Sequence, residues 1–427
     1  MHRRVFLRQL LASGALLSVG RHSWAVPAGQ PVSQPLVVIF LRGAVDGLSV
    51  LSPYTEARYA QARPDLAIAA PNLRDPRRLN NQFALHPALS SVLPYWQQGS
   101  LAFVQACGLS KNTRSHFEAQ TLMELGCNQP ATAQGSGWMN RLLQVLLTQQ
   151  QRATALNVGT VVSPILQGRV PVTPFALGRG VAGRPISQNR TNYQKLLDEL
   201  YQGSALEAEY KHSHVARQRI LAALSDDSAA SNMTSTNQPI LLGEDNTASN
   251  GAPPPSAFVT EALQIAKILR SDHNIPLVFT DVGGWDTHVN QGNISRGQLH
   301  IHLKQLADGI SQLVQALGSR YQQTTIMVLS EFGRTVQQNG TGGTDHGRGN
   351  TLWLLGGNVA GGKVYGEWPT LDREHLFEQR DIPVLIDYRQ VISQILTRQF
   401  SLSDNALNQI FPETWQSVAG LNRLWRG

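Results

Sequence analysis

The stretch "DVGGWDTH" (281–288) places a carboxylate and an imidazole two residues apart, directly after an apolar run. In an extended loop, residues two apart project to the same side of the backbone. Gly283 and Gly284 let the chain leave the strand through backbone angles that other residues rarely adopt. Asp286 and His288 could therefore bind one cation, although an Asp in this position can also cap a turn or a helix.

Residues of similar chemistry lie beside four other apolar runs. They are Asp46 (after 35–41), Thr113, Arg114, Ser115 and His116 (after 101–106), Glu331 and Arg334 (after 324–330), and Asp345 and His346 (before 350–357). In a mostly parallel sheet, ligands bind beyond the carboxyl ends of the strands, where the first three of these groups and the 281–288 stretch belong. The last group reaches the same edge only if its strand runs antiparallel.

Carboxylates and imidazoles gathered at one edge repel one another unless a cation lies between them. Oxygen and imidazole ligands suit Zn, Mn, Fe or Mg, and two such ions would lie about 3.5–4 Å apart. We therefore predict a site for one or two divalent metal ions. The predicted ligands are Asp46, Asp286, His288, Glu331, Asp345 and His346.

Each residue also has an ordinary structural interpretation. Asp46 precedes a glycine and is typical of a turn, and Glu331 and Arg334 could form a surface ion pair. Ser115 could cap a helix, with Glu118 completing a capping box. Packing or capping roles are the alternatives for His86 and His116, and solvated imidazoles are expected at His212, His214, His300 and His302. A binding site is favoured because all of the predicted ligands and catalytic residues are expected at the same edge of the sheet.

The apolar runs alternate with longer amphipathic segments, which is the pattern of an open α/β sheet. Five nearly continuous apolar runs predict strands covered on both faces: 35–41, 101–106, 275–280, 324–330 and 350–357. The predicted helical segments are 86–98, 116–126, 137–150, 191–223, 256–271, 296–319 and 387–400. We therefore predict an α/β fold with a mostly parallel central sheet sandwiched by helices.

Residues 26–427 are predicted to form one domain around this sheet. A helical embellishment is expected over 160–223. The composition of 225–256, rich in Ser, Asn, Thr and Pro, predicts an exposed and flexible insertion. Residues that would recognise a substrate's leaving group are expected within 160–250, where no motif identifies them.

The first 25 residues have the organisation of an export signal. A basic start, a short apolar stretch and a small-x-small ending predict cleavage after Ala25, and Arg3-Arg4 matches the twin-arginine pattern. The apolar stretch is too short for a bilayer core of about 30 Å, although an uncleaved anchor helix is the alternative. We predict a periplasmic protein with no stable membrane span after cleavage.

Charge and cysteine content argue against two classes of function. The formal charge of +7 includes four arginines of the signal, and removing them leaves +3, which predicts no nucleic-acid partner. Cys107 and Cys127 are predicted to be free thiols, because a helix separates them by more than the roughly 7 Å that a disulfide spans. No haem or cluster cysteine motif is present, which argues against electron transfer.

Motifs across the mature chain resemble those of a bacterial family exported by twin-arginine signals, domain of unknown function 1501. They are "LRGAVDGLS", "LHPALSSVL", "RSHFEAQTLMELG", "GWMNRLL", "GGWDTH", "SEFGRT", "GTDHGRGN" and "DYRQVISQIL". This family is similar to the alkaline phosphatase and sulfatase superfamily, whose members use two metals and a Ser, Thr or formylglycine nucleophile at a helix start. The resemblance implies an alkaline-phosphatase-like fold.

The superfamily resemblance also implies roles for individual residues, with the nucleophile within Thr113 to Ser115. The implied metal positions are Asp46 after the first strand, Asp286 and His288 on one ion, Glu331 in place of an Asp-His pair, and His346 before a strand. Two departures bear on the second ion: the spacing from Asp286 to His288 is shorter than the common Asp-x-x-x-His, and "SEF" replaces Asp-His. No Cys-x-Pro-x-Arg stretch is present, so the resemblance does not extend to formylglycine sulfatases.

Two functions are compatible with these residues. The first is a periplasmic metal-dependent hydrolase of phosphate or sulfate esters, in which Ser115 or Thr113 attacks, Arg114 or Arg334 steadies the equatorial oxygens and His116 assists proton transfer. The second is a catalytically degenerate member that acts as a periplasmic binding or assembly protein. The substrate and the oligomeric state are not predicted.

Overall fold

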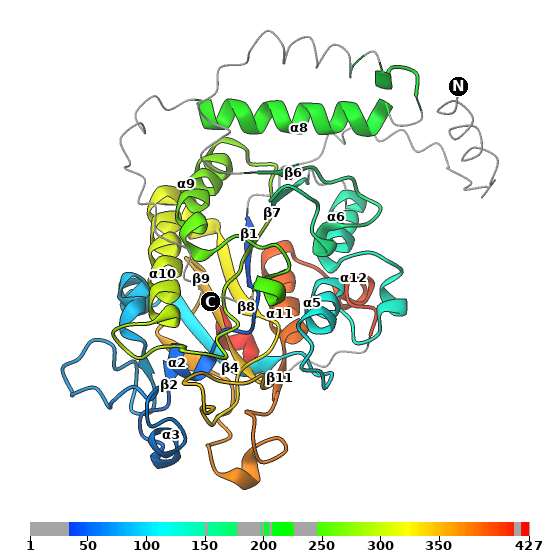
Figure 1. Cartoon of the computed structure of the whole chain (residues 1–427). Helices are drawn as coiled ribbons and strands as arrows, with labels where there is room; N and C mark the ends of the chain where they lie inside the picture. The colour runs from blue at the N-terminus through cyan, green and yellow to red at the C-terminus, as the bar shows by residue number, and fades with distance from the viewer. Residues whose placement is uncertain are drawn as a thin grey trace, which may run out of the picture.

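The structure is a computed structural model that describes residues 34–149, 153–176, 198, 200–204, 207–225, 246–413 and 420–426 (Figure 1). Nine strands in these residues form one sheet in the order β10-β4-β9-β8-β1-β7-β5-β6, with β11 paired to β4. They are β1 (Leu36–Leu41), β4 (Leu101–Gly108), β5 (Ala155–Val158), β6 (Pro174–Phe175), β7 (Leu277–Val282), β8 (Thr325–Ser330), β9 (Asn350–Gly356), β10 (Lys363–Tyr365) and β11 (Ile386–Asp387).

Strand β9 is antiparallel to both of its neighbours, β4 and β8. The other strand pairs described in this sheet are parallel. The predicted α/β class with a mostly parallel central sheet is therefore confirmed. A separate two-stranded antiparallel sheet joins β2 (Leu51–Ser52) and β3 (Ala84–Leu85).

Helices cover both faces of the main sheet (Figure 1). Their bounds are α2 (Gly47–Val50), α3 (Ala57–Ala62), α4 (Leu93–Gln97), α5 (His116–Leu125), α6 (Trp138–Thr148), α8 (Glu207–Ser225), α9 (Pro255–Ser271), α10 (Gln298–Leu317), α11 (Tyr388–Phe400) and α12 (Asp404–Ile410). Short 3-10 helices include η1 (Pro87–Val92), η2 (Pro130–Ala133), η3 (Pro164–Leu166) and η4 (Asn246–Ser249).

The alternation of side chains along β1 explains the two apolar cores. Leu36, Val38 and Phe40 belong to the core under α5, α6, α11 and α12, whereas Val37 and Ile39 belong to the core under α4, α9 and α10. Because both faces of the strand are buried, its sequence is apolar at every position. The five strands predicted from such runs are confirmed as β1, β4, β7, β8 and β9.

Several predicted segments lie partly or wholly outside the described residues. These are the signal segment, residues 226–245 of the predicted insertion and part of 160–223. The end of the insertion is not an exposed loop, because Ala248 and Ser249 are buried in η4. None of the helices in the described residues combines the length and apolar character needed to cross a membrane.

The two cysteines are free, as predicted, and both are buried. Cys107 lies near the end of β4, and Cys127 follows α5. Burial raises the pKa of the Cys107 thiol, and the nearby Asp387 carboxylate adds to this effect. Both thiols therefore serve as apolar core groups in this fold.

Candidate metal centre

The carboxyl ends of the central strands bring the polar loops together. Leu41, the last residue of β1, is opposite Val282 of β7 and Ser330 of β8, so these three strands end at the same edge. Asn350, the first residue of β9, is opposite Cys107 near the end of β4. Because β9 is antiparallel, the segment that precedes it also reaches this edge.

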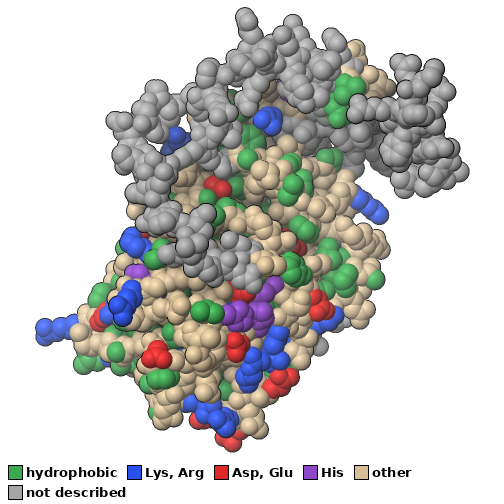
Figure 2. Space-filling view, in the orientation of Figure 1, with side chains coloured by type: hydrophobic (Ala, Val, Ile, Leu, Met, Phe, Trp, Pro, Cys, Tyr) green, Lys and Arg blue, Asp and Glu red, His purple; other side chains and the backbone are tan. Residues whose placement is uncertain are grey.

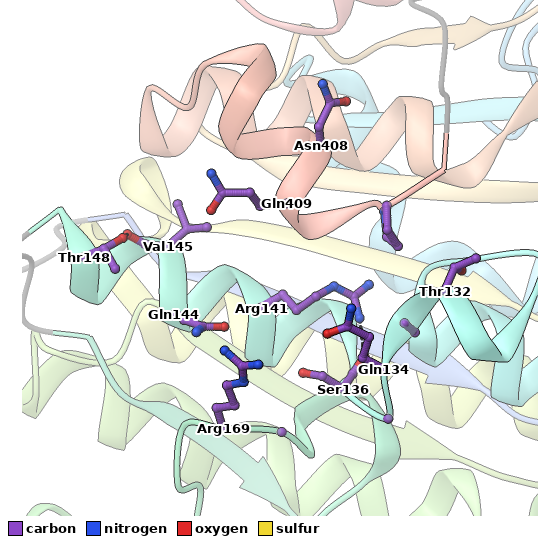
Figure 3. Close-up of a pocket in the computed structure, with 14 residues that line it drawn as sticks. Thr132, Gln134, Ser136, Arg141, Gln144, Val145, Thr148, Arg169, Asn408 and Gln409 are labelled. Carbon is purple, nitrogen blue, oxygen red and sulfur yellow. Dashed lines mark hydrogen bonds between the residues drawn. The ribbon is translucent and has the colours of Figure 1, made fainter. Parts of the chain in front are cut away.

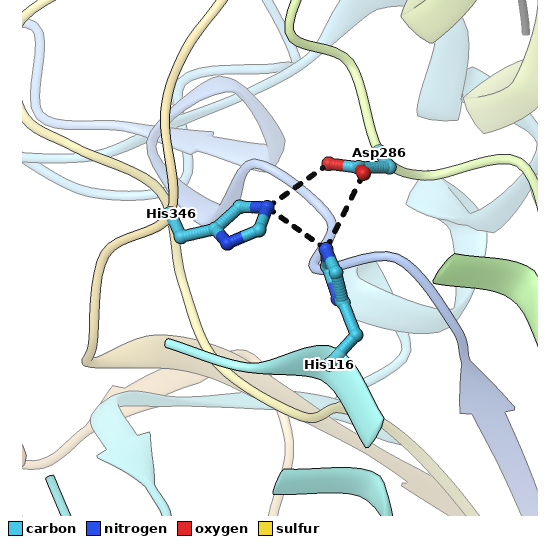
Figure 4. A group of neighbouring side chains, drawn as sticks. All are labelled: His116, Asp286 and His346. Carbon is cyan, nitrogen blue, oxygen red and sulfur yellow. Dashed lines mark hydrogen bonds and ion pairs between the residues drawn. The ribbon is translucent and has the colours of Figure 1, made fainter. Parts of the chain in front are cut away.

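Three of the predicted residues, His116, Asp286 and His346, meet at this edge (Figure 4). His116 is the first residue of α5, Asp286 lies in the loop after β7, and His346 lies in the segment before β9. The Nε2 atom of His116 is 2.9 Å from Nε2 of His346 and 3.3 Å from Oδ2 of Asp286. The Nε2 atom of His346 is 3.4 Å from Oδ1 of Asp286.

A third imidazole completes the group. The Nε2 atom of His288 is 2.8 Å from Nε2 of His346 and 3.1 Å from Oδ1 of Asp286. The side chains of His288 and His346 are 37% and 23% exposed, whereas those of Asp286 and His116 are nearly buried. Figure 2 shows histidine side chains gathered at the surface on this face of the molecule. The group is therefore closed on one side and open to solvent on the other.

The other nitrogen of each imidazole is held by an acceptor. His116 Nδ1 is 2.7 Å from Glu331 Oε1, and His346 Nδ1 is 2.7 Å from the Arg114 carbonyl oxygen. Carbonyl and carboxylate oxygens accept hydrogen bonds, so both Nδ1 atoms carry hydrogen. In the neutral imidazoles, Nε2 then presents a lone pair, and this arrangement is typical of histidines that bind metals.

The same holds for the third imidazole, since His288 Nδ1 is 3.2 Å from Asp345 Oδ1. All three Nε2 atoms lie within 3.4 Å of an Asp286 carboxylate oxygen. Such a set is repulsive unless protons or a metal ion lie between its members. The geometry thus calls for positive charge at the centre of the group.

The pKa values of the group reflect the need for positive charge beside Asp286. Burial raises the pKa of Asp286, but hydrogen bonds from His116, His288 and His346 and the charge of Arg334 outweigh it and hold the pKa well below its usual range. Burial lowers the pKa of His116, but hydrogen bonds and charges from Asp286 and Glu331 raise it to about 9. The hydrogen bond to Asp286 likewise raises the pKa of His288.

Two predicted ligands, Glu331 and Asp345, lie behind the imidazoles. Glu331 is fully buried, and its Oε1 accepts from Gly43 N at 2.8 Å and Gln120 Nε2 at 2.9 Å as well as from His116. Asp345 is half exposed and faces His288 Nδ1. Both predictions are corrected: these carboxylates orient imidazoles instead of facing the shared centre.

The structure does not bring Asp46 into the group. Its carboxylate is fully buried and accepts from Arg63 at 2.6 and 3.0 Å, from Ser49 Oγ at 2.7 Å and from Gln291 Nε2 at 2.7 Å. Burial raises the pKa of Asp46, but the Arg63 guanidinium more than offsets this and lowers it. The ligand role predicted for Asp46 is corrected because both oxygens are already occupied, by partners that no sequence motif identified.

Thr113 and Ser115 take part in capping α5. Ser115 Oγ accepts from the Glu118 amide at 3.4 Å, and Thr113 Oγ1 accepts from the Ser115 amide at 3.2 Å. The Glu118 carboxylate is bonded to Thr113 Oγ1 at 2.7 Å and to Lys111 at 3.0 Å. The predicted capping box is therefore only half formed, because the Ser115 amide donates to Thr113 Oγ1 and not to the Glu118 carboxylate. These contacts support the capping interpretation and do not place either hydroxyl among the converging ligands.

The two arginines predicted to bind substrate oxygens have other partners. Arg334 is buried, donates to the Ala44 and Thr344 carbonyls at 2.7 and 3.0 Å, and contacts Asp286 Oδ1 at 2.5 Å. Arg114 pairs at 2.6 Å with Asp381 and at 2.6 Å with Glu378. The prediction for Arg334 is corrected, because its donors fix the loops around Asp286; Arg114 lies at the rim and is 29% exposed.

The glycines before Asp286 are required by close packing. A Cβ at Gly283 would lie 2.7 Å from Ser249 Oγ, and one at Gly284, whose φ is +87°, would lie 2.9 Å from the His302 ring. His302 is buried and its Nδ1 is 2.8 Å from the Gly284 carbonyl oxygen, which corrects the expectation of a solvated imidazole. His86 caps η1 through Nδ1, in line with its ordinary interpretation.

Comparison with known proteins identifies the family. A family model described as "Protein of unknown function (DUF1501)" matches residues 33–411. The chain belongs to the DUF1501 family. Two solved structures of Ps i-CgsB, one of them in complex with k-i-k-neocarrahexaose, are similar at 13% and 12% identity, with TM-scores of 0.41 and 0.40, over 89% of this chain and 76% of theirs. No curated protein matches the chain.

Proposed function

We propose that this DUF1501 protein binds one divalent metal ion through His116, Asp286, His288 and His346 and hydrolyses phosphate or sulfate esters there. The observation that supports the proposal is the convergence of three Nε2 atoms on one carboxylate, with every Nδ1 held by an acceptor. Hydrogen-bonded imidazoles of this kind are typical of metal centres.

The dimensions of the group fit a metal ion. Bonds of about 2.0–2.1 Å in a tetrahedron place the ligand atoms about 3.3–3.4 Å apart. Ligand atoms of His116, Asp286 and His346 lie within 4.8 Å of one another, and His288 Nε2 is 2.8 Å from His346 Nε2 and 3.1 Å from Asp286 Oδ1. Shifts of these side chains would bring all four ligands to the spacing that the ion requires. Three nitrogens and one carboxylate favour Zn, Mn or Fe over Mg, which prefers oxygen ligands.

A bound divalent cation supplies Lewis acidity toward an ester oxygen and activates water. The chain holds the four ligands, and Glu331, the Arg114 carbonyl and Asp345 orient the three imidazoles. The exposed side of His288 and His346 provides the approach for a substrate. Water is the nucleophile in this proposal, because the Ser115 and Thr113 hydroxyls are engaged in capping α5.

The test combines elemental analysis of the purified full chain with a panel of aryl phosphate monoesters, diesters and sulfate esters. We expect one ion per chain, turnover of at least one ester, loss of turnover on chelation and recovery on addition of Zn, Mn or Fe. An absence of bound metal after loading with each of these ions would refute the proposal.

A second candidate is a metal-binding protein without ester hydrolysis, which acts in binding or assembly. Two contacts favour it. Asp46, which the superfamily resemblance implies is a metal ligand, is bonded to Arg63. Ser115, one of the implied nucleophiles, accepts a hydrogen bond from the Glu118 amide. One tightly bound ion with no turnover across the ester panel would select this candidate.

We also propose that the protein is exported to the periplasm by the twin-arginine route. The proposal rests on the sequence of residues 1–25, which lie outside the described residues. Replacement of Arg3 and Arg4 by Lys should retain the chain in the cytoplasmic fraction. Unchanged delivery of the Lys variant to the periplasm would contradict twin-arginine export.

A further inference from the structure

A polar cavity of about 650 Å³ lies between η2, α6 and α12 (Figure 3). This volume is within the usual range of small-molecule sites, about 300–1,000 Å³. The lining includes amide, hydroxyl and guanidinium groups, among them Gln134, Ser136, Gln144, Arg169 and Gln409. No metal-centre residue lines it, so the cavity is a separate feature of the molecule.

The charged groups that line the cavity are both cations. Arg141 and Arg169 contribute guanidinium groups, and no Asp or Glu is among the described lining residues. The nearest acid in sequence, Glu413, is bonded to Arg389 at 2.8 Å and to the Asn128 amide at 2.7 Å. Its charge is therefore compensated elsewhere.

Arg141 is a partly buried cation held by backbone carbonyls. Its Nε donates to the Ile410 carbonyl at 2.7 Å, one Nη to the Leu125 carbonyl at 2.5 Å, and the other Nη to the Ser136 carbonyl. Within the described residues no carboxylate forms an ion pair with it. Three of the five guanidinium N–H groups are used in this way, which leaves two for a ligand.

The energetics of Arg141 differ from those of the paired arginines. Burial lowers the pKa of Arg141, because no carboxylate offsets the loss of solvation. Burial also opposes the charge of Arg42, but Glu124 and Asp281 outweigh it and raise the pKa. An anion in the cavity would supply for Arg141 the compensation that carboxylates supply for Arg42.

Arg169 is presented by a fixed loop. Asn140 on α6 donates to the Leu166 and Val170 carbonyls at 2.8 and 2.7 Å and accepts from the Val170 amide at 3.1 Å. A Cβ at Gly168 would lie 2.4 Å from Asn140 Oδ1, so the loop packs directly against α6. The exposed Arg169 side chain is thus anchored next to the cavity.

We propose that this cavity binds a sugar that carries a carboxylate, phosphate or sulfate group. The two guanidinium groups would bind the anionic group through charge-assisted hydrogen bonds. The amides of Gln134, Gln144 and Gln409 would bind the ring hydroxyls. Arg141 holds the last carbonyl of α5 and His116 begins this helix, so the two sites lie at opposite ends of a helix about 15 Å long.

The test is calorimetric titration of the full chain with glucuronate, glucose 6-phosphate and glucose 6-sulfate, with glucose as the neutral control. We expect at least one anionic sugar to bind and glucose not to bind. Arg169→Gln should weaken binding about tenfold, and Arg169→Glu should abolish it, because a charge-assisted bond is lost and then replaced by repulsion. The matched control Arg74→Gln, at an exposed loop position, should bind like the wild type.

A metal-ligand variant separates this site from the metal centre. His346→Ala should retain the binding of the anionic sugar, whether or not the protein hydrolyses esters. Loss of binding in His346→Ala together with full binding in Arg169→Glu would place the anion at the metal centre and overturn the proposal. Failure of the wild type to bind any of the three anionic sugars would also overturn it.

Discussion

Two carboxylates at the same edge of the sheet have opposite surroundings. Asp46 is neutralised by the Arg63 guanidinium, and Gln291 and Ser49 supply its remaining hydrogen bonds. Asp286 also contacts a guanidinium, that of Arg334 at 2.5 Å, but it faces in addition three imidazoles whose Nε2 atoms lie within 2.9 Å of a neighbouring Nε2. A guanidinium brings a permanent charge and complements a carboxylate, whereas neutral imidazoles bring lone pairs. Arg63, Gln291 and Ser49 therefore satisfy Asp46 fully, whereas the imidazole lone pairs beside Asp286 favour a further cation even though Arg334 is present.

Among variants that test this difference between Asp46 and Asp286, removal of Arg63 should cause the largest change, a loss of stability. Arg63→Met leaves the Asp46 carboxylate buried without a counter-ion, so the free energy of unfolding should fall by about 3–5 kcal/mol. The metal content should stay at the wild-type level. Urea unfolding and elemental analysis measure both quantities. A loss of stability below about 1 kcal/mol would show that this pair does not hold Asp46 in place.

Removal of an imidazole should weaken metal binding and leave stability nearly unchanged, the reverse of what is expected for Arg63→Met. His346→Ala takes away one of the four proposed ligands, so metal affinity should fall on the order of a hundredfold to a thousandfold. The stability of the metal-free protein should change by less than about 1 kcal/mol, because His346 is partly exposed. The matched control is His273→Ala, at an exposed turn between α9 and β7. Equal metal affinity of the two variants, measured against a competing chelator, would refute the ligand assignment.

Glu261 on α9 extends the comparison to a buried carboxyl group with no cation. Burial and the Asp281 charge raise its pKa to about 7, and the hydrogen bond with Thr280 only partly opposes them. The folded state thus binds more protons than the unfolded state between pH 4.5 and about 7, and stability falls as pH rises through this window.

Glu261→Gln removes this titration. Relative to the wild type, the metal-free variant should gain about 3 kcal/mol in unfolding free energy between pH 4.5 and pH 8, since a tenfold change in proton affinity corresponds to about 1.4 kcal/mol. Urea unfolding at both pH values checks this. A difference between the two proteins that does not depend on pH would contradict the assignment of the titration to Glu261.

The fold was largely predictable from the sequence, because strands buried on both faces leave continuous apolar runs, as in β1, β7 and β8. The short strands β5, β6, β10 and β11 span two to four residues and leave no such pattern. The antiparallel direction of β9 also left no trace in its sequence, since β9 is buried at every position like the parallel strand β1.

The candidate site was only partly predictable for a related reason. Strand-end position identified the carboxylates and imidazoles that reach the edge, but not the direction of each side chain. Glu331 and Asp345 face Nδ1 atoms instead of the centre, and Asp46 pairs with Arg63, which lies 17 residues further along the chain. These outcomes depend on tertiary contacts between distant segments, which no local spacing encodes.

Glu331 and Asp345 give the test with the smallest expected effects. Both carboxylates accept from the Nδ1 atom of an imidazole, but one is buried and the other is exposed. Glu331 is buried and binds His116 Nδ1 at 2.7 Å, whereas Asp345 is 52% exposed and lies 3.2 Å from His288 Nδ1. Glu331→Gln should weaken metal binding about 10–100-fold, as expected for a buried partner of a ligand. Asp345→Asn should weaken it less than about threefold, because solvent screens an exposed pair. Chelator competition measures both, and a larger loss in Asp345→Asn would mean that orientation of the exposed His288 limits metal binding.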